Sequence, residues 1–359
     1  MKKIRYAVVG AGWISQEAFM PGVAQTGNSE IAAIVSGNLE RAKALADFHA
    51  VPAVYSYDQY DAMLASGTVD AVYIALPNSQ HADYAIRAAR AGVHALVEKP
   101  LAVTVAECEA MIAAAGKAGV WLMTAYRLHT EPGTIAAMEL VRSGAIGEPR
   151  MFSSVFSFQS DPRNHRLQAA HWGGPLQDLG VYCINAARHL FASEPVEVMA
   201  MTGRGGNDPR FAEIEETFAA TLRFPGGRMA NFLVSFGADM AEFYTVHGSK
   251  GTLEASPGYR FETARRLVLT VDGKSTEQDF PHVDNFSGQT AYFSDCILNR
   301  VRPEADGEDG LADVAIMRAL EEAARTGRPQ PVSLPSRDRH PGADTLRPFP
   351  HAKRRLLVP

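Results

Sequence analysis

The chain has 359 residues, of which 46% are hydrophobic and 21% charged, and its formal net charge is −5. This length and balance are typical of a packed globular protein of about two domains and exclude a disordered chain. Because no basic excess exists to attract nucleic acid or an anionic membrane, we expect an enzyme that acts on small molecules.

Cysteine usage and the amino-terminal segment both indicate the cytoplasm. Cys108, Cys183 and Cys296 are too few and too widely spaced for a disulfide framework or a CxxC motif, and such usage fits a reducing compartment. The opening residues lead directly into a strand pattern without the apolar core of a signal peptide, and no apolar run has membrane-spanning length. No motif predicts a metal site.

The first third of the chain alternates short apolar runs with helical patterns. Such alternation is typical of βαβ units, so we predict an α/β Rossmann domain at residues 1–124 with a doubly wound parallel sheet. The run at 69–76 is apolar almost throughout, as expected for a strand buried on both faces. The predicted strands are 6–9, 31–35, 54–55, 69–76, 93–97 and 121–124, and the predicted helices are 14–26, 39–48, 57–65, 81–91 and 105–118.

After residue 124 the pattern changes to strand-like segments joined by turn signals such as Pro225-Gly226-Gly227. We predict an α+β domain at 125–331 with a large, mostly antiparallel open sheet. Residues 332–359 lack periodicity, which predicts an extended or disordered tail, whose basic cluster at 353–355 is either solvated or binds an acidic partner. The predicted strands are 151–159, 197–202, 215–224, 228–236, 242–247, 251–255 and 266–271, and the predicted helices are 132–143, 179–190, 288–298 and 309–326.

A glycine-rich turn stands where a Rossmann fold binds its dinucleotide. Gly10-Ala11-Gly12-Trp13-Ile14-Ser15 follows the first predicted strand and opens the first helix. Gly10 permits a tight turn, and Gly12 lets the backbone approach a pyrophosphate, whose charge the helix amino terminus favours. Ser15 replaces the third glycine of the fingerprint but is small enough for close packing of helix on strand. We infer a dinucleotide site rather than a turn that binds nothing.

The residues after the second strand indicate which dinucleotide binds. An NAD site usually has an acidic residue there, which accepts a hydrogen bond from the ribose 2′-hydroxyl. This chain has Ser36-Gly37 instead, and Arg41 follows on the first turn of the next helix. Guanidinium groups prefer phosphate, so NADP(H) is favoured over NAD(H). The alternative is that Arg41 is an ordinary exposed helix arginine.

Two separated motifs carry candidate catalytic groups. Glu98-Lys99-Pro100 ends a strand at the carboxyl edge of the predicted sheet, where doubly wound folds bind ligands. Asp178 and Tyr182 stand four residues apart, so on a helix they share one face. Together such groups can move a proton or polarise a substrate hydroxyl. Taken singly, each has a structural alternative: a lysine reaching to water, a helix N-cap and a half-buried tyrosine.

These motifs together resemble the glucose–fructose oxidoreductase family, the Gfo/Idh/MocA-type sugar dehydrogenases. The resemblance is carried by VVGAG, SGN after the second strand, ALPNSQHADYAIRAARAGVHALVEKPLA and GGPLQDLGVY, and it covers residues 4–331. The branch around glucose–fructose oxidoreductase itself is the most similar. One departure is Gly173-Gly174-Pro175-Leu176, where the family usually has Gly-Gly-Gly-Ser, so the wall of the substrate pocket should differ.

The resemblance implies a role for each matching residue. It places Lys99, in a cis Lys99–Pro100 element, beside the nicotinamide and the substrate, with Tyr182 as the acid/base group and Asp178 as its partner. Ser36, Gly37 and Arg41 match positions that hold the 2′-phosphate. The other implied cofactor residues are Gly10, Gly12, Trp13, Ile14, Tyr57, Leu76, Pro77, Asn78, His81, Glu98 and Arg127, and Tyr126 is implied near the substrate. Apart from the resemblance, the further candidates for substrate contacts are Arg127, His165, Arg166, His171 and Trp172, for which a purely structural role is an equal alternative.

The predicted function is hydride transfer between NADP(H) and a sugar, either an aldose oxidised at C1 to the lactone or a keto-sugar reduced in the reverse direction. Two other functions are compatible with the sequence. One is a glycoside-cleaving enzyme that oxidises its sugar transiently, and the other is a non-catalytic sugar or cofactor sensor. A broad open sheet is costly to expose, so a homodimer or homotetramer through that sheet is expected.

Overall fold

The computed structural model describes residues 2–353 and 355–359. Its contacts divide the chain into two compact units, which we call unit 1 and unit 2. Unit 1 contains Met1–Glu131, Val283–Leu311 and Thr345–Pro359, and unit 2 contains Pro132–His282 and Ala312–Asp344. The division differs from a single boundary at 124/125, because two later segments return to the first unit. Periodicity describes each segment locally and carries no information about such a return.

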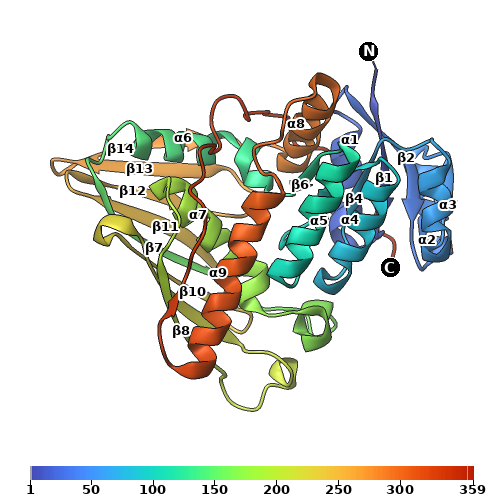
Figure 1. Ribbon diagram of the computed structural model, residues 1–359. Helices are drawn as coiled ribbons and strands as arrows, with labels where there is room; N and C mark the ends of the chain where they lie inside the picture. Colours follow the sequence, from blue (N-terminus) through green and yellow to red (C-terminus); the bar gives the residue numbers. More distant parts are fainter. Residues whose placement is uncertain (1, 354) are drawn as a thin grey trace. The chain divides into compact units, whose positions relative to one another are not determined.

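Within the described residues, unit 1 is built on a six-stranded parallel sheet in the order β3-β2-β1-β4-β5-β6. This order confirms the predicted doubly wound arrangement, in which the carboxyl ends of the strands meet at one edge. β4 is buried at every residue, as its apolar run predicted. The strands are β1 (Ile4–Val9), β2 (Ser29–Val35), β3 (Ala53–Tyr55), β4 (Ala71–Ile74), β5 (His94–Val97) and β6 (Leu122–Thr124) (Figure 1).

The helices of unit 1 include one formed by a late segment of the chain. Ser294, on α8, lies 2.9 Å from the Tyr6 hydroxyl and 2.8 Å from that of Ser29, so α8 packs against β1 and β2. Satisfying these buried hydroxyls favours the return of α8 to this sheet. The helices are α1 (Met20–Val23), α2 (Leu39–His49), α3 (Tyr60–Ala65), α4 (His81–Arg90), α5 (Val105–Ala118) and α8 (Asn285–Asn299).

The helix predicted at 14–26 is shorter and wider than expected. Residues Ser15–Phe19 form a π-helical turn, and α1 then ends at Val23. Pro21 stands at the start of α1 and has no backbone N–H to donate to the preceding turn. A widened turn directly before it accommodates the missing hydrogen bond.

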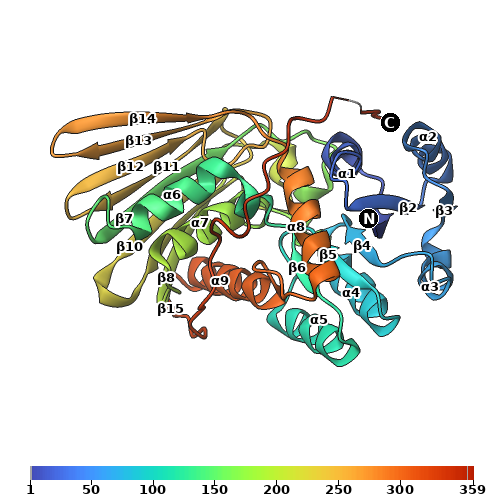
Figure 2. The same ribbon diagram turned by 90° about the horizontal axis from the view of Figure 1, so that it is seen from above.

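Unit 2 contains a sheet of nine described strands in the order β14-β13-β12-β11-β7-β10-β9-β8-β15. Only β7 and β10 run parallel, so the predicted, mostly antiparallel sheet is confirmed. α6 and α7 lie on one face of it, α6 over β12 to β14 and α7 over β7 (Figure 2). The strands are β7 (Pro149–Ser157), β8 (Glu197–Gly203), β9 (Thr217–Arg223), β10 (Met229–Ser235), β11 (Ala241–Gly248), β12 (Gly251–Ser256), β13 (Arg265–Val271), β14 (Lys274–Phe280) and β15 (Gln330–Pro331).

The remaining helices and the tail complete the two units. α6 (Pro132–Arg142) and α7 (Val181–Phe191) belong to unit 2, whereas α9 (Gly307–Thr326) begins in unit 1 and continues in unit 2. After β15 the described residues form no helix or strand, and Arg354 of the basic cluster lies outside the described residues. No helix of the described chain is both long enough and apolar enough to cross a membrane.

His94, at the start of β5, makes the stability of unit 1 depend on pH. Its Nδ1 accepts a 2.8 Å hydrogen bond from the Trp121 backbone N–H, which requires the neutral ring. Burial lowers the pKa of His94 to about 4, against the opposing charge of Asp70. The unfolded chain therefore binds the proton first as the pH falls below about 6.5.

We expect acidification from pH 7 to pH 5 to cost about 2 kcal/mol of folding free energy through His94 alone. In His94→Asn the amide oxygen can accept the same hydrogen bond but does not titrate, so this part of the pH dependence should vanish. Urea unfolding at both pH values checks it. An unchanged pH dependence in the variant would mean that His94 is not the titrating group.

Candidate active site

The predicted dinucleotide turn has the conformation that its glycines allow. Gly10 has a φ of 97°, and a Cβ there would lie 2.5 Å from the Ala75 carbonyl oxygen, so only glycine fits. Apart from Gly12 itself and its two chain neighbours, no described atom lies within 4 Å of the Cβ position at Gly12, which leaves the approach to the helix amino terminus open for a pyrophosphate. The buried Ser15 hydroxyl donates to the Gly10 carbonyl oxygen at 2.6 Å, which explains how serine replaces the third glycine.

After β2, a helix N-cap fixes the backbone at Arg41. Asn38 caps α2, and its side-chain oxygen accepts a 2.9 Å hydrogen bond from the Arg41 backbone N–H. Ser36 is buried, and its hydroxyl oxygen accepts from the Asn38 N–H at 3.2 Å. The Tyr57 ring lies against Gly37. Burial raises the pKa of Tyr57, and the Arg41 charge opposes that shift. A hydroxyl and a guanidinium therefore stand at the carboxyl end of β2, where a 2′-phosphate is expected.

His81, at the start of α4, joins the loops that follow β4 and β5. Its two ring nitrogens lie 2.9 Å from the carbonyl oxygens of Leu76 and Pro100. Two carbonyl partners favour the charged ring, but burial is the larger effect and, with the Lys99 charge, lowers the pKa of His81. The neutral ring then donates to one of the two carbonyls. His81 is thus a positioning residue for the segment that carries Lys99.

Glu98 and Lys99 follow β5 at the same edge of the sheet. The Tyr73 hydroxyl donates to Glu98 Oε1 at 2.6 Å. Lys99 is 9% exposed, and the Lys99–Pro100 bond is cis, as the resemblance implied. A lysine buried to this degree needs a chemical reason, because lysines rarely lie so deep without one.

The other cofactor candidates divide into buried and exposed residues. Tyr126 and Arg127 follow β6 and are both 5% exposed, and the Arg127 guanidinium lies 6.0 Å from the Phe286 ring on α8. Trp13 is 54% exposed at the start of the first helix. Pro77 and Asn78 lead into the short helical turn Asn78–Gln80 after β4. The predicted cofactor residues of unit 1 thus follow the ends of β1, β2, β4, β5 and β6, with Tyr57 after β3.

Asp178 and Tyr182 lie in unit 2 on one continuous helical segment. Asp178 belongs to the π-helical turn Leu176–Gly180, which runs directly into α7. Its Oδ1 lies 3.0 Å from Nε of Arg166, one of the predicted substrate residues. The Tyr182 ring packs 5.8 Å from that of Phe156 and 6.0 Å from that of Tyr259. Aromatic contacts therefore hold the Tyr182 ring, and Arg166 holds the carboxylate.

Trp172 is tied to residues that sequence reasoning missed. Its indole N–H donates to Glu321 at 2.6 Å, Gln177 donates to the same carboxylate oxygen at 2.8 Å, and the Arg318 guanidinium lies 4.3 Å from its ring centroid. Glu321 and Arg318 lie on α9, about 150 residues after Trp172 in the sequence. The sequence of that helix gave no indication that these residues contact Trp172. His165 and His171 face each other edge-on with centroids 6.1 Å apart.

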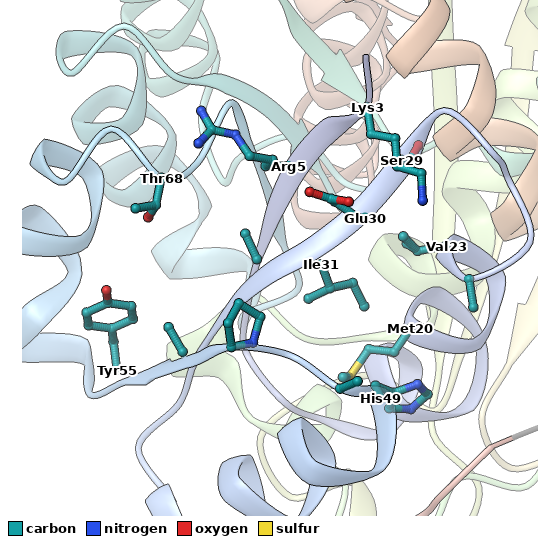
Figure 3. Close-up of a pocket in the computed structure, with 15 residues that line it drawn as sticks. Lys3, Arg5, Met20, Val23, Ser29, Glu30, Ile31, His49, Tyr55 and Thr68 are labelled. Carbon is teal, nitrogen blue, oxygen red and sulfur yellow. The ribbon is translucent and has the colours of Figure 1, made fainter. Parts of the chain in front are cut away.

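One other feature of unit 1 lies apart from these residues. A pocket of about 620 Å³ lies at the amino ends of β1 and β2. Figure 3 shows Lys3, Arg5, Ser29 and Glu30 among the residues that line it. None of the predicted site residues lines it, and its charges are mixed. We assign it no part in dinucleotide binding, because doubly wound folds bind their ligands at the opposite, carboxyl edge of the sheet.

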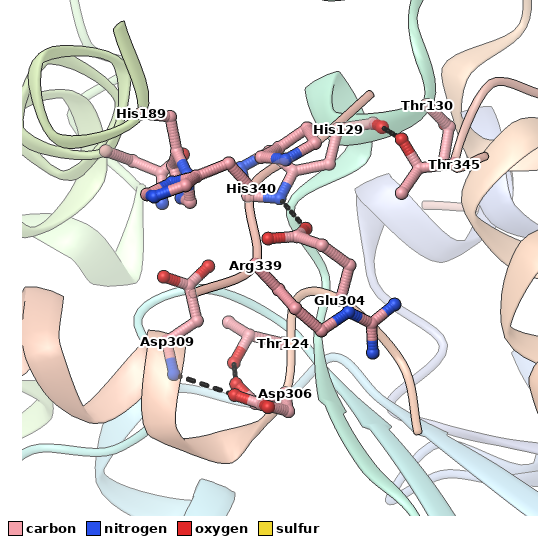
Figure 4. A network of polar contacts seen from close by, with 12 residues as sticks. Thr124, His129, Thr130, His189, Glu304, Asp306, Asp309, Arg339, His340 and Thr345 are labelled. Carbon is pink, nitrogen blue, oxygen red and sulfur yellow. Dashed lines mark hydrogen bonds and ion pairs between the residues drawn. The ribbon is translucent and has the colours of Figure 1, made fainter. Parts of the chain in front are cut away.

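A buried polar network lies around the segment between α8 and α9. Figure 4 shows His129, whose Nδ1 lies 2.8 Å from the Glu304 carboxylate and whose carbonyl oxygen accepts from the Thr345 hydroxyl at 2.5 Å. In the same region the Asp309 backbone N–H donates to Asp306 at 3.0 Å. These contacts join three separate segments of unit 1 and are structural.

Comparison with known proteins gives consistent matches along the chain. Residues 4–126 match the model of an oxidoreductase family with an NAD-binding Rossmann fold, and residues 134–254 match the GFO/IDH/MocA C-terminal domain. A D-xylose 1-dehydrogenase [NADP(+)] of Haloarcula marismortui is 33% identical, over 90% of this chain and 91% of its own length.

Two solved structures are similar over most of the chain. An aldose-aldose oxidoreductase from Caulobacter crescentus, complexed with glycerol, is 38% identical with a TM-score of 0.88, over 92% of this chain and all of its own. KijD10, a 3-ketoreductase from Actinomadura kijaniata in complex with NADP and TDP-benzene, is 27% identical with a TM-score of 0.83, over 90% of this chain and 98% of its own.

Proposed function

Because the chain belongs to the Gfo/Idh/MocA oxidoreductase family, we propose that it transfers a hydride between NADP(H) and a sugar. The first candidate reaction is oxidation of an aldose at C1 to the lactone, and the second is reduction of a keto-sugar. The observation that carries the proposal is the set of groups at one sheet edge: the dinucleotide turn, Ser36 with Arg41, and the buried Lys99. The relatives named for NADP-dependent xylose oxidation and aldose chemistry support it.

We propose the following roles for residues of this chain. The Gly10–Ser15 turn would hold the pyrophosphate, and Ser36, Gly37 and Arg41 the 2′-phosphate. The bound dinucleotide supplies the hydride acceptor or donor at C4 of its nicotinamide. Tyr182 would exchange the proton of the reacting sugar hydroxyl, assisted by Lys99 and by Asp178, whose orientation Arg166 fixes.

The other predicted contacts keep their proposed roles. We propose that the following residues line the cofactor: Trp13, Ile14, Tyr57, Leu76, Pro77, Asn78, Glu98 and Arg127. His81, which was also predicted to line it, is fully buried and is proposed to position the Lys99 segment instead. Tyr126, His165, Arg166 and Trp172 remain the proposed substrate contacts. Since Arg166 and Trp172 are already paired with carboxylates of unit 2, we expect them to shape the sugar site mainly by holding Asp178 and the 172–177 segment.

The test is the near-ultraviolet absorbance of reduced nicotinamide after mixing the protein with NADP⁺ or NAD⁺ and a panel of aldoses and polyols. We expect turnover with an aldose, faster with NADP⁺ than with NAD⁺. If one sugar is oxidised while another is reduced and no cofactor has been added, the protein carries out the same hydride transfer with a cofactor that stays bound through both half-reactions. Release of an aglycone from a glycoside, or binding without any turnover, would overturn the dehydrogenase assignment.

The uncovered face of the nine-stranded sheet supports a proposed oligomer. Its outward residues pair across the strands: Met229 stands beside Met151, and Leu233 lies two strands from Phe243. All four are between 39% and 52% exposed. A contiguous apolar patch on a sheet is typical of a protein interface. We propose a homodimer or homotetramer through this face.

The buried Cys108, Cys183 and Cys296 form no disulfide with one another. From this cysteine usage we propose a cytoplasmic location.

A further inference from the structure

The carboxyl-terminal segment of the chain is docked on unit 1 rather than projecting from it. Upstream, the Gln25 side chain donates to the Pro350 carbonyl oxygen at 2.8 Å, and the Asp284 N–H donates to that of Phe349 at the same distance. Arg347 pairs with Asp295 on α8 at 3.0 Å. These contacts bring residues 355–359, which we call the strap, to the carboxyl edge of the six-stranded sheet.

The strap is joined to the dinucleotide turn through one buried side chain. Gln16, 3% exposed, accepts from the Val358 N–H at 2.6 Å and donates to the Val358 carbonyl oxygen at 3.3 Å. The same amide nitrogen donates to the Ala11 carbonyl oxygen, inside the turn, at 2.8 Å. Arg355 also forms an ion pair with Glu17, the next residue on the helix. A buried amide with both ends satisfied in this way fixes the strap in register with the turn.

The strap also reaches the arginine expected to hold the 2′-phosphate. Nε of Arg41 donates to a main-chain oxygen of Pro359, the last residue of the sequence, at 2.8 Å. Among the described residues, the side chain of Arg41 has no other hydrogen bond or ion pair. A guanidinium has two edges, and a phosphate takes one of them through two parallel N–H donors. With Nε occupied by the strap, the edge formed by the two terminal nitrogens stays available to a phosphate.

The hydrogen bond that holds one edge of the Arg41 guanidinium affects the affinity for a phosphate-bearing ligand. A long arginine side chain loses rotamer freedom when it binds a ligand, and a side chain already oriented loses less. The benefit applies only to a ligand that uses the arginine, which is a dinucleotide carrying a 2′-phosphate. A ribose with a free 2′-hydroxyl gains nothing comparable from it.

We propose that the strap, residues 355–359, orients Arg41 for the 2′-phosphate and so contributes to the selection of NADP(H) over NAD(H). Arg41 contacts the cofactor in this scheme, and Gln16, Glu17 and Arg355 are positioning residues. The inference rests on the proposed function, because it assumes that the dinucleotide binds at the Gly10–Ser15 turn.

The experiment compares the dissociation constants of NADP⁺ and NAD⁺ by calorimetry in the full chain and in a variant lacking residues 355–359. We expect the loss of the strap to weaken NADP⁺ about tenfold, equivalent to about 1.4 kcal/mol, and to leave NAD⁺ unchanged. Arg355→Ala should shift NADP⁺ in the same direction by a smaller factor. Lys353→Ala removes an equal charge from an exposed position of the same segment, and we expect it to change neither constant.

A double-mutant cycle separates orientation from general electrostatics. If the strap acts through Arg41, its removal from Arg41→Ala should cause no further loss of NADP⁺ affinity. Equal discrimination with and without the strap would overturn the inference, and so would tighter NADP⁺ binding after its removal, since the strap would then be a competitor. Failure of the cofactor assignment looks different: the full chain itself would bind NAD⁺ as well as NADP⁺, or neither.

Discussion

Replacing Tyr182 with Phe should lower turnover by two to four orders of magnitude, as loss of a general acid/base group does. The ring contacts with Phe156 and Tyr259 do not involve the hydroxyl, so the variant should fold and bind cofactor as before. Lys99→Ala should lower turnover to a similar extent. Steady-state kinetics with NADP⁺ and the best aldose of the panel, together with calorimetric cofactor binding, measures both.

The matched control is Tyr244→Phe, which removes a phenolic hydroxyl elsewhere in unit 2. The centroid of the Tyr244 ring lies 5.7 Å from that of the Phe152 ring. We expect the loss of the Tyr244 hydroxyl to leave turnover within a few-fold of that of the unchanged protein. Unchanged turnover in both Tyr182→Phe and Lys99→Ala would show that these residues do not carry the chemistry. Loss of cofactor binding in Lys99→Ala would instead assign that lysine to the dinucleotide.

Replacing Asp313 with Ala should be the most destabilising single change in unit 2. Asp313 is fully buried and pairs with Arg188 at 2.6 Å, while its other oxygen accepts from Asn185 at 3.0 Å. Arg188 is 1% exposed and also pairs with Glu194. Removing one member leaves a buried guanidinium only partly compensated, which costs about 3–5 kcal/mol. Urea unfolding followed by circular dichroism gives the change in free energy.

An exposed pair in the same unit provides the comparison. Arg266 and Asp279 pair across β13 and β14 at 2.7 Å, but both side chains are more than half exposed. Solvent screens such a pair, so Asp279→Ala should leave the unfolding midpoint almost unchanged. A similar midpoint for Asp313→Ala would mean that the buried pair contributes no more than a surface one.

Hydrophobic pattern predicted most of the elements because most of them bury a face. The strand predictions in unit 1 each overlap an observed strand of the six-stranded sheet. β14 was missed because Lys274–Phe280 is polar and exposed at nearly every position, so it carries no alternation. Its only signal is the Asp272-Gly273 turn, where both residues have positive φ and join β13 to β14 as a two-residue hairpin.

The local structure around the candidate site was predictable where nearby residues constrain the backbone, and contacts between distant segments were not. Gly10 and the Asn38 cap act within a few residues, so spacing alone placed the turn and Arg41. The roles proposed for Lys99, Asp178 and Tyr182 came from family resemblance and remain predictions. The contact of Val358 with Gln16 uses backbone atoms of the tail, so no pattern of side chains in the tail could predict it.

The discontinuous make-up of unit 1 has a consequence during synthesis of the chain on the ribosome. The Tyr6 hydroxyl lies beside that of Ser294, a partner made 288 residues later. At about 5–20 residues per second, the first strand waits roughly 15–60 s for the helix that covers its flank. During this time the nascent Rossmann sheet exposes apolar surface while unit 2 emerges. We therefore expect a nascent chain stalled before residue 283 to depend on chaperones, because it lacks α8 and the later segments of both units.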